Sequence, residues 1–106
     1  MDAVFQKSDA WLLLAIVMAA VEGRASLAQI VEAGDYINHA VFSDQELNGG
    51  LERLGRIGLL SKNGDMIVVE KEAVNLHEEA SRKTKNLIKI MENLEKLLIK
   101  KFHAES

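Results

Sequence analysis

The sequence predicts a single α+β domain that is mainly helical. Three observations predict it: two capping boxes in front of apolar-periodic stretches, an Asn-Gly pair between two apolar stretches, and a C-terminal segment with a seven-residue apolar repeat. The boxes begin at Ser26 and Ser43 and mark helix N-termini. The pair Asn63-Gly64 marks a β-hairpin. The expected order is therefore three helices, a hairpin and a long last helix.

Composition limits the class of protein. The chain has 106 residues, of which 48% are hydrophobic and 27% charged, as in an ordinary globular domain. It has no cysteine, so disulfides and thiolate metal sites are excluded. The apolar run Trp11 to Val21 is shorter than the roughly 20 residues of a membrane span. The residues in front of it contain two acids, Asp2 and Asp9, and one base, Lys7, whereas a signal peptide has a positively charged region there. We therefore expect a cytoplasmic protein.

The charge is unevenly distributed along the chain. Residues 1–72 carry six Lys/Arg and eleven Asp/Glu, a net charge of −5, whereas residues 73–106 carry seven Lys/Arg and five Asp/Glu, a net charge of +2. A nucleic-acid-binding domain usually presents a basic surface. The acidic N-terminal part therefore argues against strong sequence-independent affinity for DNA.

The first helix is expected to begin at a cap formed by Ser8 or Asp9 and to run to about Glu22, where Gly23 ends it. Its apolar residues cover most of its circumference, so we expect it in the middle of the domain. They include Trp11, Leu12, Leu14, Ala15, Met18 and Val21.

The second helix opens at the box formed by Ser26 and Gln29. Gly34 either breaks this helix or permits a close contact. In the connection that follows, Val41 or Phe42 is expected to fill the core. The apolar stripe of the helix comprises Leu27, Ile30, Val31 and Ile37.

The third helix opens at the stronger box, in which Glu46 also complements the positive helix end. Gly58 is placed to end it in a left-handed conformation. Gly49 and Gly50 inside it each cost about 1 kcal/mol relative to alanine. We interpret them as allowing close packing against the first helix, rather than a small-molecule contact. The residues expected to be buried are Leu47, Leu51, Leu54 and Ile57.

The hairpin is the sharpest local prediction. Both residues of an Asn63-Gly64 turn adopt positive φ, and the β-branched run after it supplies the return strand. A short third strand is expected around Arg24-Ala25.

One long helix is expected from Glu72 or Asn75 to about Phe102. Its apolar residues repeat at spacings of four and three, the pattern of a seam between paired helices. Because an exposed seam would promote aggregation, we expect residues 73–106 to form a dimerisation helix behind a domain of residues 1–72. The seam comprises Ala80, Thr84, Leu87, Met91, Leu94 and Leu98.

The stretch from Ser43 through Leu47, Leu51 and Leu54 to Gly58-Leu59-Leu60 resembles the passage from third helix to wing in winged helix-turn-helix proteins. The C-terminal helix is similar to the dimerisation helix of small PadR- and MarR-type bacterial regulators. The resemblance implies a homodimeric DNA-binding transcriptional regulator whose third helix enters the major groove. Two departures from it are the acids of the first turn of the third helix and the long connection before Ser43.

The resemblance implies a set of DNA contacts. Glutamine and asparagine bond adenine edges, whereas arginine bonds guanine or phosphate. The alternative for the helix positions is a solvated face with ordinary charge pairs, such as Glu52 with Arg56. The set comprises Gln45, Asn48, Arg53, Arg56, Lys62 and Asn63.

A second interpretation is a winged helix that binds a partner protein through its acidic third helix, without DNA. No motif of an enzyme is present in the sequence, and the three histidines lie at unrelated positions. We therefore expect no catalytic activity, cofactor or metal site. The Lys/Arg of the last helix are mixed with acids, which favours a paired helix over a membrane surface.

Overall fold

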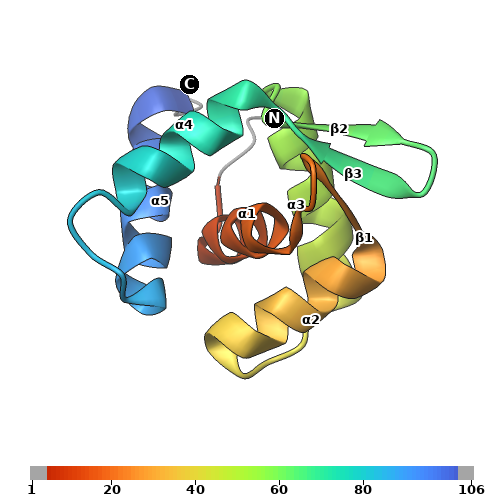
Figure 1. The fold of residues 1–106 in the computed structure, drawn as a ribbon, viewed down its shortest axis with the longest axis horizontal. Coiled ribbons are helices and arrows are strands. Elements are labelled where there is room, and N and C mark those ends of the chain that lie inside the picture. Colours follow the sequence, from red (N-terminus) through yellow and green to blue (C-terminus); the bar gives the residue numbers. More distant parts are fainter. Residues whose placement is uncertain (1–4, 103–106) are drawn as a thin grey trace.

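The first helix, α1 (Lys7–Ala19), lies at the centre of the fold, with the other helices packed around it (Figure 1). The computed structural model describes residues 5–102. All residues of α1 from Asp9 to Ile16 are buried, as expected for a helix that is apolar nearly all round. Five helices and a three-stranded antiparallel sheet make up the described part, which confirms the α+β, mainly α class.

The ends of α1 differ from those expected. The cap is Gln6, whose backbone N–H donates to Asp9 Oδ2 at 2.9 Å. The helix stops at Ala19, before Glu22. Val21 then pairs with Arg24 across a turn in which Glu22 and Gly23 both have positive φ, so the chain turns into the sheet instead of continuing the helix.

Both predicted capping boxes are confirmed. Ser26 and Gln29 exchange reciprocal bonds at the start of α2 (Leu27–Asn38). Ser43 and Glu46 do the same at the start of α3 (Asp44–Arg56). Leu27, expected in the buried stripe of α2, is exposed, whereas Ile30 and Ile37 are buried.

Gly34 permits a close contact and does not break α2. A Cβ at Gly34 would lie 2.9 Å from Phe42 Cζ. Phe42 is buried and stacks on Trp11, whose Nε1–H donates to the Gly34 carbonyl at 2.9 Å. Of the two candidates, Phe42 therefore fills the core, while Val41 is exposed.

Gly50 likewise lies against α1, as predicted. A Cβ there would meet Leu12 Cδ2 at 2.6 Å and Asp9 Oδ1 at 3.2 Å. Gly58 ends α3 with φ +85, and Leu59 N–H donates to the Leu54 carbonyl, a Schellman-type end.

The sheet has the order β1 (Arg24–Ser26), β3 (Met66–Val69), β2 (Leu60–Asn63), with both pairings antiparallel. The hairpin and the short third strand are confirmed. The turn lies one residue later than predicted, because Asn63 pairs with Met66 and leaves Gly64-Asp65 as the loop. Gly64 has positive φ and Asn63 does not. The first loop position is therefore occupied by a glycine, which adopts positive φ without a steric penalty.

The prediction of one long C-terminal helix is wrong. The structure has two helices, α4 (Lys71–Ala80) and α5 (Leu87–Phe102), which pack against each other (Figure 1). Ser81 Oγ donates back to the His77 carbonyl where α4 ends. Asn86 Oδ1 accepts from Lys89 N–H where α5 begins.

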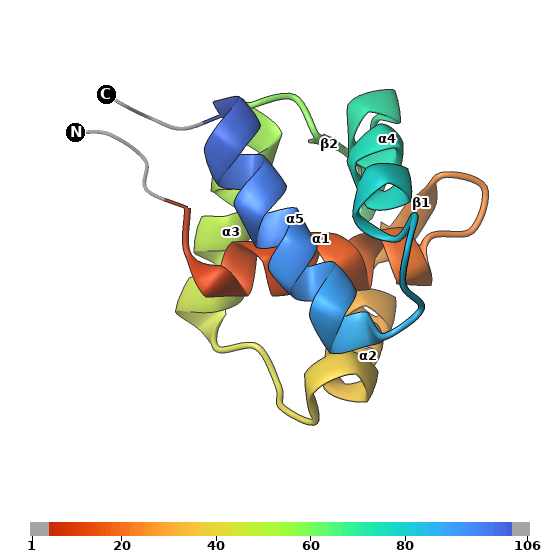
Figure 2. The ribbon, with the colours of Figure 1, turned by 90° about the vertical axis from the view of Figure 1, so that its left-hand side faces the viewer.

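The predicted seam faces the interior of the same chain. Met91, Leu94 and Leu98 are buried, and α5 crosses over α1 (Figure 2). Ala80 is buried too, while Thr84 lies in the connection and Leu87 is half-buried. The exposed seam that motivated a dimerisation helix is therefore satisfied within one chain.

Candidate functional site

The exposed surface of α3 and the neighbouring strand β2 carries most of the predicted contact residues. We call this surface the α3–hairpin face. Gln45, Asn48 and Arg56 are exposed on α3, and Lys62 and Asn63 are exposed on β2.

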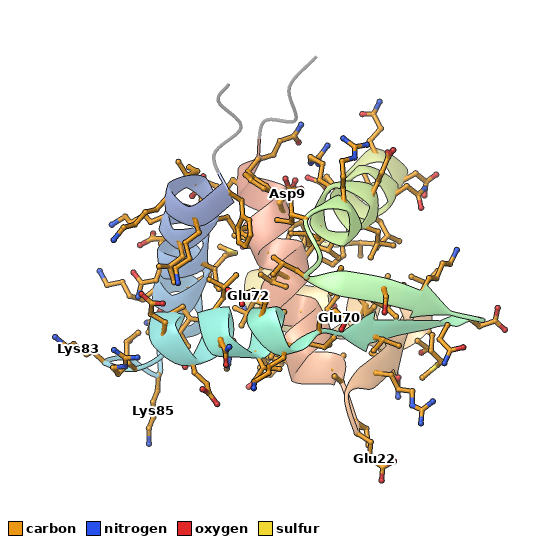
Figure 3. All side chains as sticks on the ribbon, turned by 90° about the horizontal axis from the view of Figure 1, so that it is seen from above. Asp9, Glu22, Glu70, Glu72, Lys83 and Lys85 are labelled. Atoms are coloured by element: carbon orange, nitrogen blue, oxygen red, sulfur yellow. The ribbon has the colours of Figure 1, made fainter. Side chains whose placement is uncertain are left out.

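Arg53, which was also predicted to contact DNA, does not lie on the exposed part of this face, because its side chain is already engaged within the fold. Its guanidinium makes a bidentate contact with Asp9 of α1: Nε to Oδ2 and Nη2 to Oδ1, both at 2.8 Å. The Asp9 side chain is 0% exposed and that of Arg53 is 18% exposed. Figure 3 shows Asp9 at the side of α1 next to α3. The hydrogen bond to Asp9 raises the pKa of Arg53, so the guanidinium keeps its charge across the physiological range.

Arg56 is the second arginine of α3. Its Nη2 lies 2.8 Å from Glu52 Oε2, one turn earlier, and both side chains are more than half exposed. Such a pair contributes little to stability, but it partly neutralises Arg56. This is the charge pair weighed as the alternative to a DNA contact.

A groove of about 290 Å³ separates α3 from the hairpin. Leu60, Lys62 and Ile67 share one face of the hairpin, because side chains alternate along β2 and Lys62 pairs with Ile67. Leu60 and Ile67 are buried at the floor. The lining comprises Asn48, Leu51, Glu52, Gly55, Leu60, Ser61, Lys62 and Ile67. The groove thus brings Asn48 and Lys62 together, while Asn63 projects from the opposite face of the hairpin.

The electrostatics of the α3–hairpin face are those of an acidic surface. Once Glu52 is paired with Arg56, the acids Asp44, Glu46 and Asp65 face one unpaired cation, Lys62, among the described residues of α3 and the hairpin. Glu46 also accepts from the Ser43 backbone N–H in the capping box, whereas Asp44 is exposed. Phosphates approaching here would meet net negative charge.

The histidines of the described residues do not come together in a metal or catalytic site. His39 is exposed at the end of α2, and His77 is half-buried on α4, where burial lowers its pKa. No group of three potential metal-ligating side chains occurs within residues 5–102.

The ion pair between Asp9 and Arg53 is the feature that sequence reasoning missed. The two residues are 44 positions apart, and no local pattern links them. One signal was available: an aspartate embedded in the most apolar helix needs a buried partner, and Gly50 marked the place on α3 where α1 comes close. Gly49, which was expected to allow the same contact, lies against the Arg53 side chain instead.

Within the described part, no helix has both the length and the apolar character needed to cross a bilayer. The candidate site is the α3–hairpin face with its groove. Asn48 and Lys62 line the groove, and Gln45 and Arg56 are exposed on the same helix as Asn48. No protein-family model, curated protein or solved structure matches the chain.

Proposed function

We propose that the chain is a winged-helix interaction module that binds a partner protein through the α3–hairpin face. The order α1, β1, α2, α3, β2, β3 supports the winged-helix part of the proposal, because it is the order on which the resemblance in the sequence depends. The hairpin is then the wing, and α3 is the helix that other members of the fold use for recognition.

One observation carries the choice of a protein partner. Asp9 holds Arg53 and Glu52 pairs with Arg56, so α3 offers no unpaired cation within the described residues. DNA affinity depends chiefly on cations that neutralise phosphates. An acidic face beside a groove with an apolar floor suits a protein segment instead.

The chemistry of the groove indicates what the partner segment looks like. The floor of Leu51, Leu60 and Ile67 suits one or two aliphatic side chains, since apolar anchors in small pockets dominate the affinity of such interfaces. The acids at the N-terminal end of α3 suit a flanking Lys or Arg. The partner segment is therefore basic and carries aliphatic anchors.

The experiment is an NMR titration of ¹⁵N-labelled protein with a synthetic peptide that alternates Lys and Leu. We expect shifts at Asn48, Gly55 and Ser61, and we expect Leu51→Glu to abolish them because it places a charge in the apolar floor. Val41→Glu, which adds the same charge at an exposed apolar residue outside the groove, is the control for the added charge. An absence of shifts at the groove, or shifts unaffected by Leu51→Glu, would contradict the proposal.

A DNA-binding regulator is the second candidate, favoured by the exposed amides of Gln45 and Asn48 beside Lys62. Amide side chains bond adenine in the major groove. Its test is fluorescence anisotropy with a mixed-sequence duplex at low and at physiological salt. Binding that weakens with salt, with a slope that falls by about one on Lys62→Ala or Arg56→Ala, would replace the protein partner by DNA.

A further inference from the structure

A second groove, of about 370 Å³, lies between α1, the start of α3 and α5. We call it the Trp11 groove. Trp11 and Met91 are almost fully buried in its wall, and Ile88 stands at its edge with 42% of its surface exposed. Three carboxylates and one amine also line it: Glu46, Glu92, Glu95 and Lys7. The groove is therefore apolar inside and acidic at its edge.

The connection between α4 and α5 has the opposite charge. No acid occurs between Glu79 and Glu92, and this interval contains Arg82, Lys83, Lys85 and Lys89. All four are exposed, and none makes an ion pair with another residue of the range 5–102. Lys83 and Lys85 extend away from the body of the molecule (Figure 3).

The basic and acidic stretches lie on either side of Ile88. Three of the four cations, at 82–85, precede it, and Lys89 comes directly after it. The acids Glu92 and Glu95 lie further along α5. At 1.5 Å per residue, Glu92 lies about 6 Å beyond Ile88 along the helix axis. A surface that changes from basic to acidic across an exposed apolar residue is complementary to itself when the second copy runs antiparallel.

We propose that a second copy of this chain docks there. The two copies are related by a twofold axis near Ile88, so that the basic connection of each covers the acidic edge of the Trp11 groove of the other. This is an isologous interface, in which each contact occurs twice. Ile88 of both copies is buried at its centre.

This pairing uses a different surface from the predicted seam. Met91, Leu94 and Leu98 stay buried within each chain, and only the flank of α5 that carries Ile88 and Glu92 faces the second copy. The apolar area is small, so most of the specificity comes from the reciprocal charges. The dimer is accordingly expected to be reversible and to weaken as salt screens the charges.

The test is a pair of charge-reversal variants studied by sedimentation equilibrium. One is Glu92→Lys with Glu95→Lys, which makes both stretches basic; the other is Lys83→Glu with Lys85→Glu, which makes both acidic. Each variant alone is expected to dimerise at least about tenfold more weakly than the unaltered chain. An equimolar mixture of the two is expected to recover the dimer, because every reversed stretch then meets its opposite.

Arg24→Glu with Lys71→Glu is the matched control, since it makes the same charge change at exposed positions elsewhere and is expected to leave the dimer intact. Three results would overturn the proposal: a monomeric unaltered chain, variants that dimerise as well as it does, or a mixture that stays monomeric. A monomer whose Ile88 and Glu92 amides shift when the Lys/Leu peptide is added would assign the groove to a foreign basic segment. None of these outcomes bears on Asn48, Gly55 and Ser61, which report on the proposed function.

Discussion

At the scale of single residues, the ion pair of Asp9 and Arg53 makes an asymmetric prediction. Arg53→Met leaves the fully buried Asp9 carboxylate without its cation and is expected to lower the free energy of unfolding by about 3–5 kcal/mol. Asp9→Asn should cost less, because the partly exposed guanidinium can turn toward water. Urea denaturation measures both.

The control is the double variant Asp9→Leu with Arg53→Met, which replaces the whole pair by apolar groups. It is expected to be more stable than Arg53→Met alone, since no buried charge remains. Additive losses in the double variant would mean that the two side chains stabilise the fold independently.

Gly34 and Gly55 make opposite predictions for the same substitution. Gly34→Ala pushes a methyl group into Phe42, which stacks on Trp11, so we expect a loss of about 1–3 kcal/mol from overpacking and altered tryptophan fluorescence. Gly55→Ala meets nothing closer than a carbonyl at 3.8 Å and should gain up to about 1 kcal/mol of helix propensity. Equal effects at the two sites would contradict the close contact at Gly34.

His77 predicts a pH dependence of stability. Burial lowers its pKa below the ordinary value, against the smaller opposing effect of Glu78. The unfolded chain therefore binds the proton more readily, and this contribution to stability is complete above about pH 6.5 and is lost as the pH falls through the lowered pKa. His77→Gln should flatten the Tm between pH 7.5 and 5.5. An unchanged slope, relative to the exposed Asn75→Gln on the same helix, would exclude His77 as the cause.

Residues whose role is local were predictable, and residues whose role is distant were not. Ser26, Ser43 and Gly58 act on amides or carbonyls a few positions away, so their spacing alone identified them. Asp9 was interpreted as a cap, and it does bond Gln6. Its second partner, Arg53, is brought to it by packing between helices, which spacing does not encode.

At the scale of elements, the start of α5 is predicted to depend on Asn86. Its side chain accepts from Lys89 N–H at 3.0 Å, and Thr84 Oγ1 accepts from Asn86 N–H. Asn86→Ala should destabilise the protein by about 1 kcal/mol, the usual cost of a lost N-cap, whereas Asn86→Asp should retain stability. Chemical denaturation of both variants checks this. Equal losses would show that the connection is held by other contacts.

The same connection explains why the long C-terminal helix was predicted wrongly. The apolar spacing runs on from Ala80 through Thr84 to Leu87, as in an unbroken helix. The break is stabilised by contacts that only the folded chain makes, such as the hydrogen bond from Asn93 Nδ2 to the Ala80 carbonyl at 3.0 Å.

The hairpin and the helix caps were predictable because their sequence signals are short-range. The register of the turn was missed by one residue, since either Asn63 or Gly64 was able to open the loop.

At the scale of the whole molecule, periodicity indicated that one face of the C-terminal segment is buried but not what covers it. The seam residues Leu94 and Leu98 are 0% exposed within one chain, packed where α5 crosses α1 (Figure 2). The C-terminal segment is thus part of the core that surrounds α1. Residues 1–72 without it would leave the side of α1 that α5 covers exposed to water.

The stability of a single chain should therefore depend on α5 even at concentrations too low for any dimer. Leu98→Ala is expected to cost about 2–5 kcal/mol, as for a buried leucine, whereas Ile99→Ala, at the neighbouring position with 49% exposure, should cost less than about 1 kcal/mol. A chain that ends at Asn86 should lose cooperative unfolding and bind a hydrophobic dye, because the side of α1 that α5 covers becomes exposed to water. If that shortened chain unfolded cooperatively with the Tm of the intact protein, α5 would be a separable arm, and its apolar face would need a cover from outside the chain.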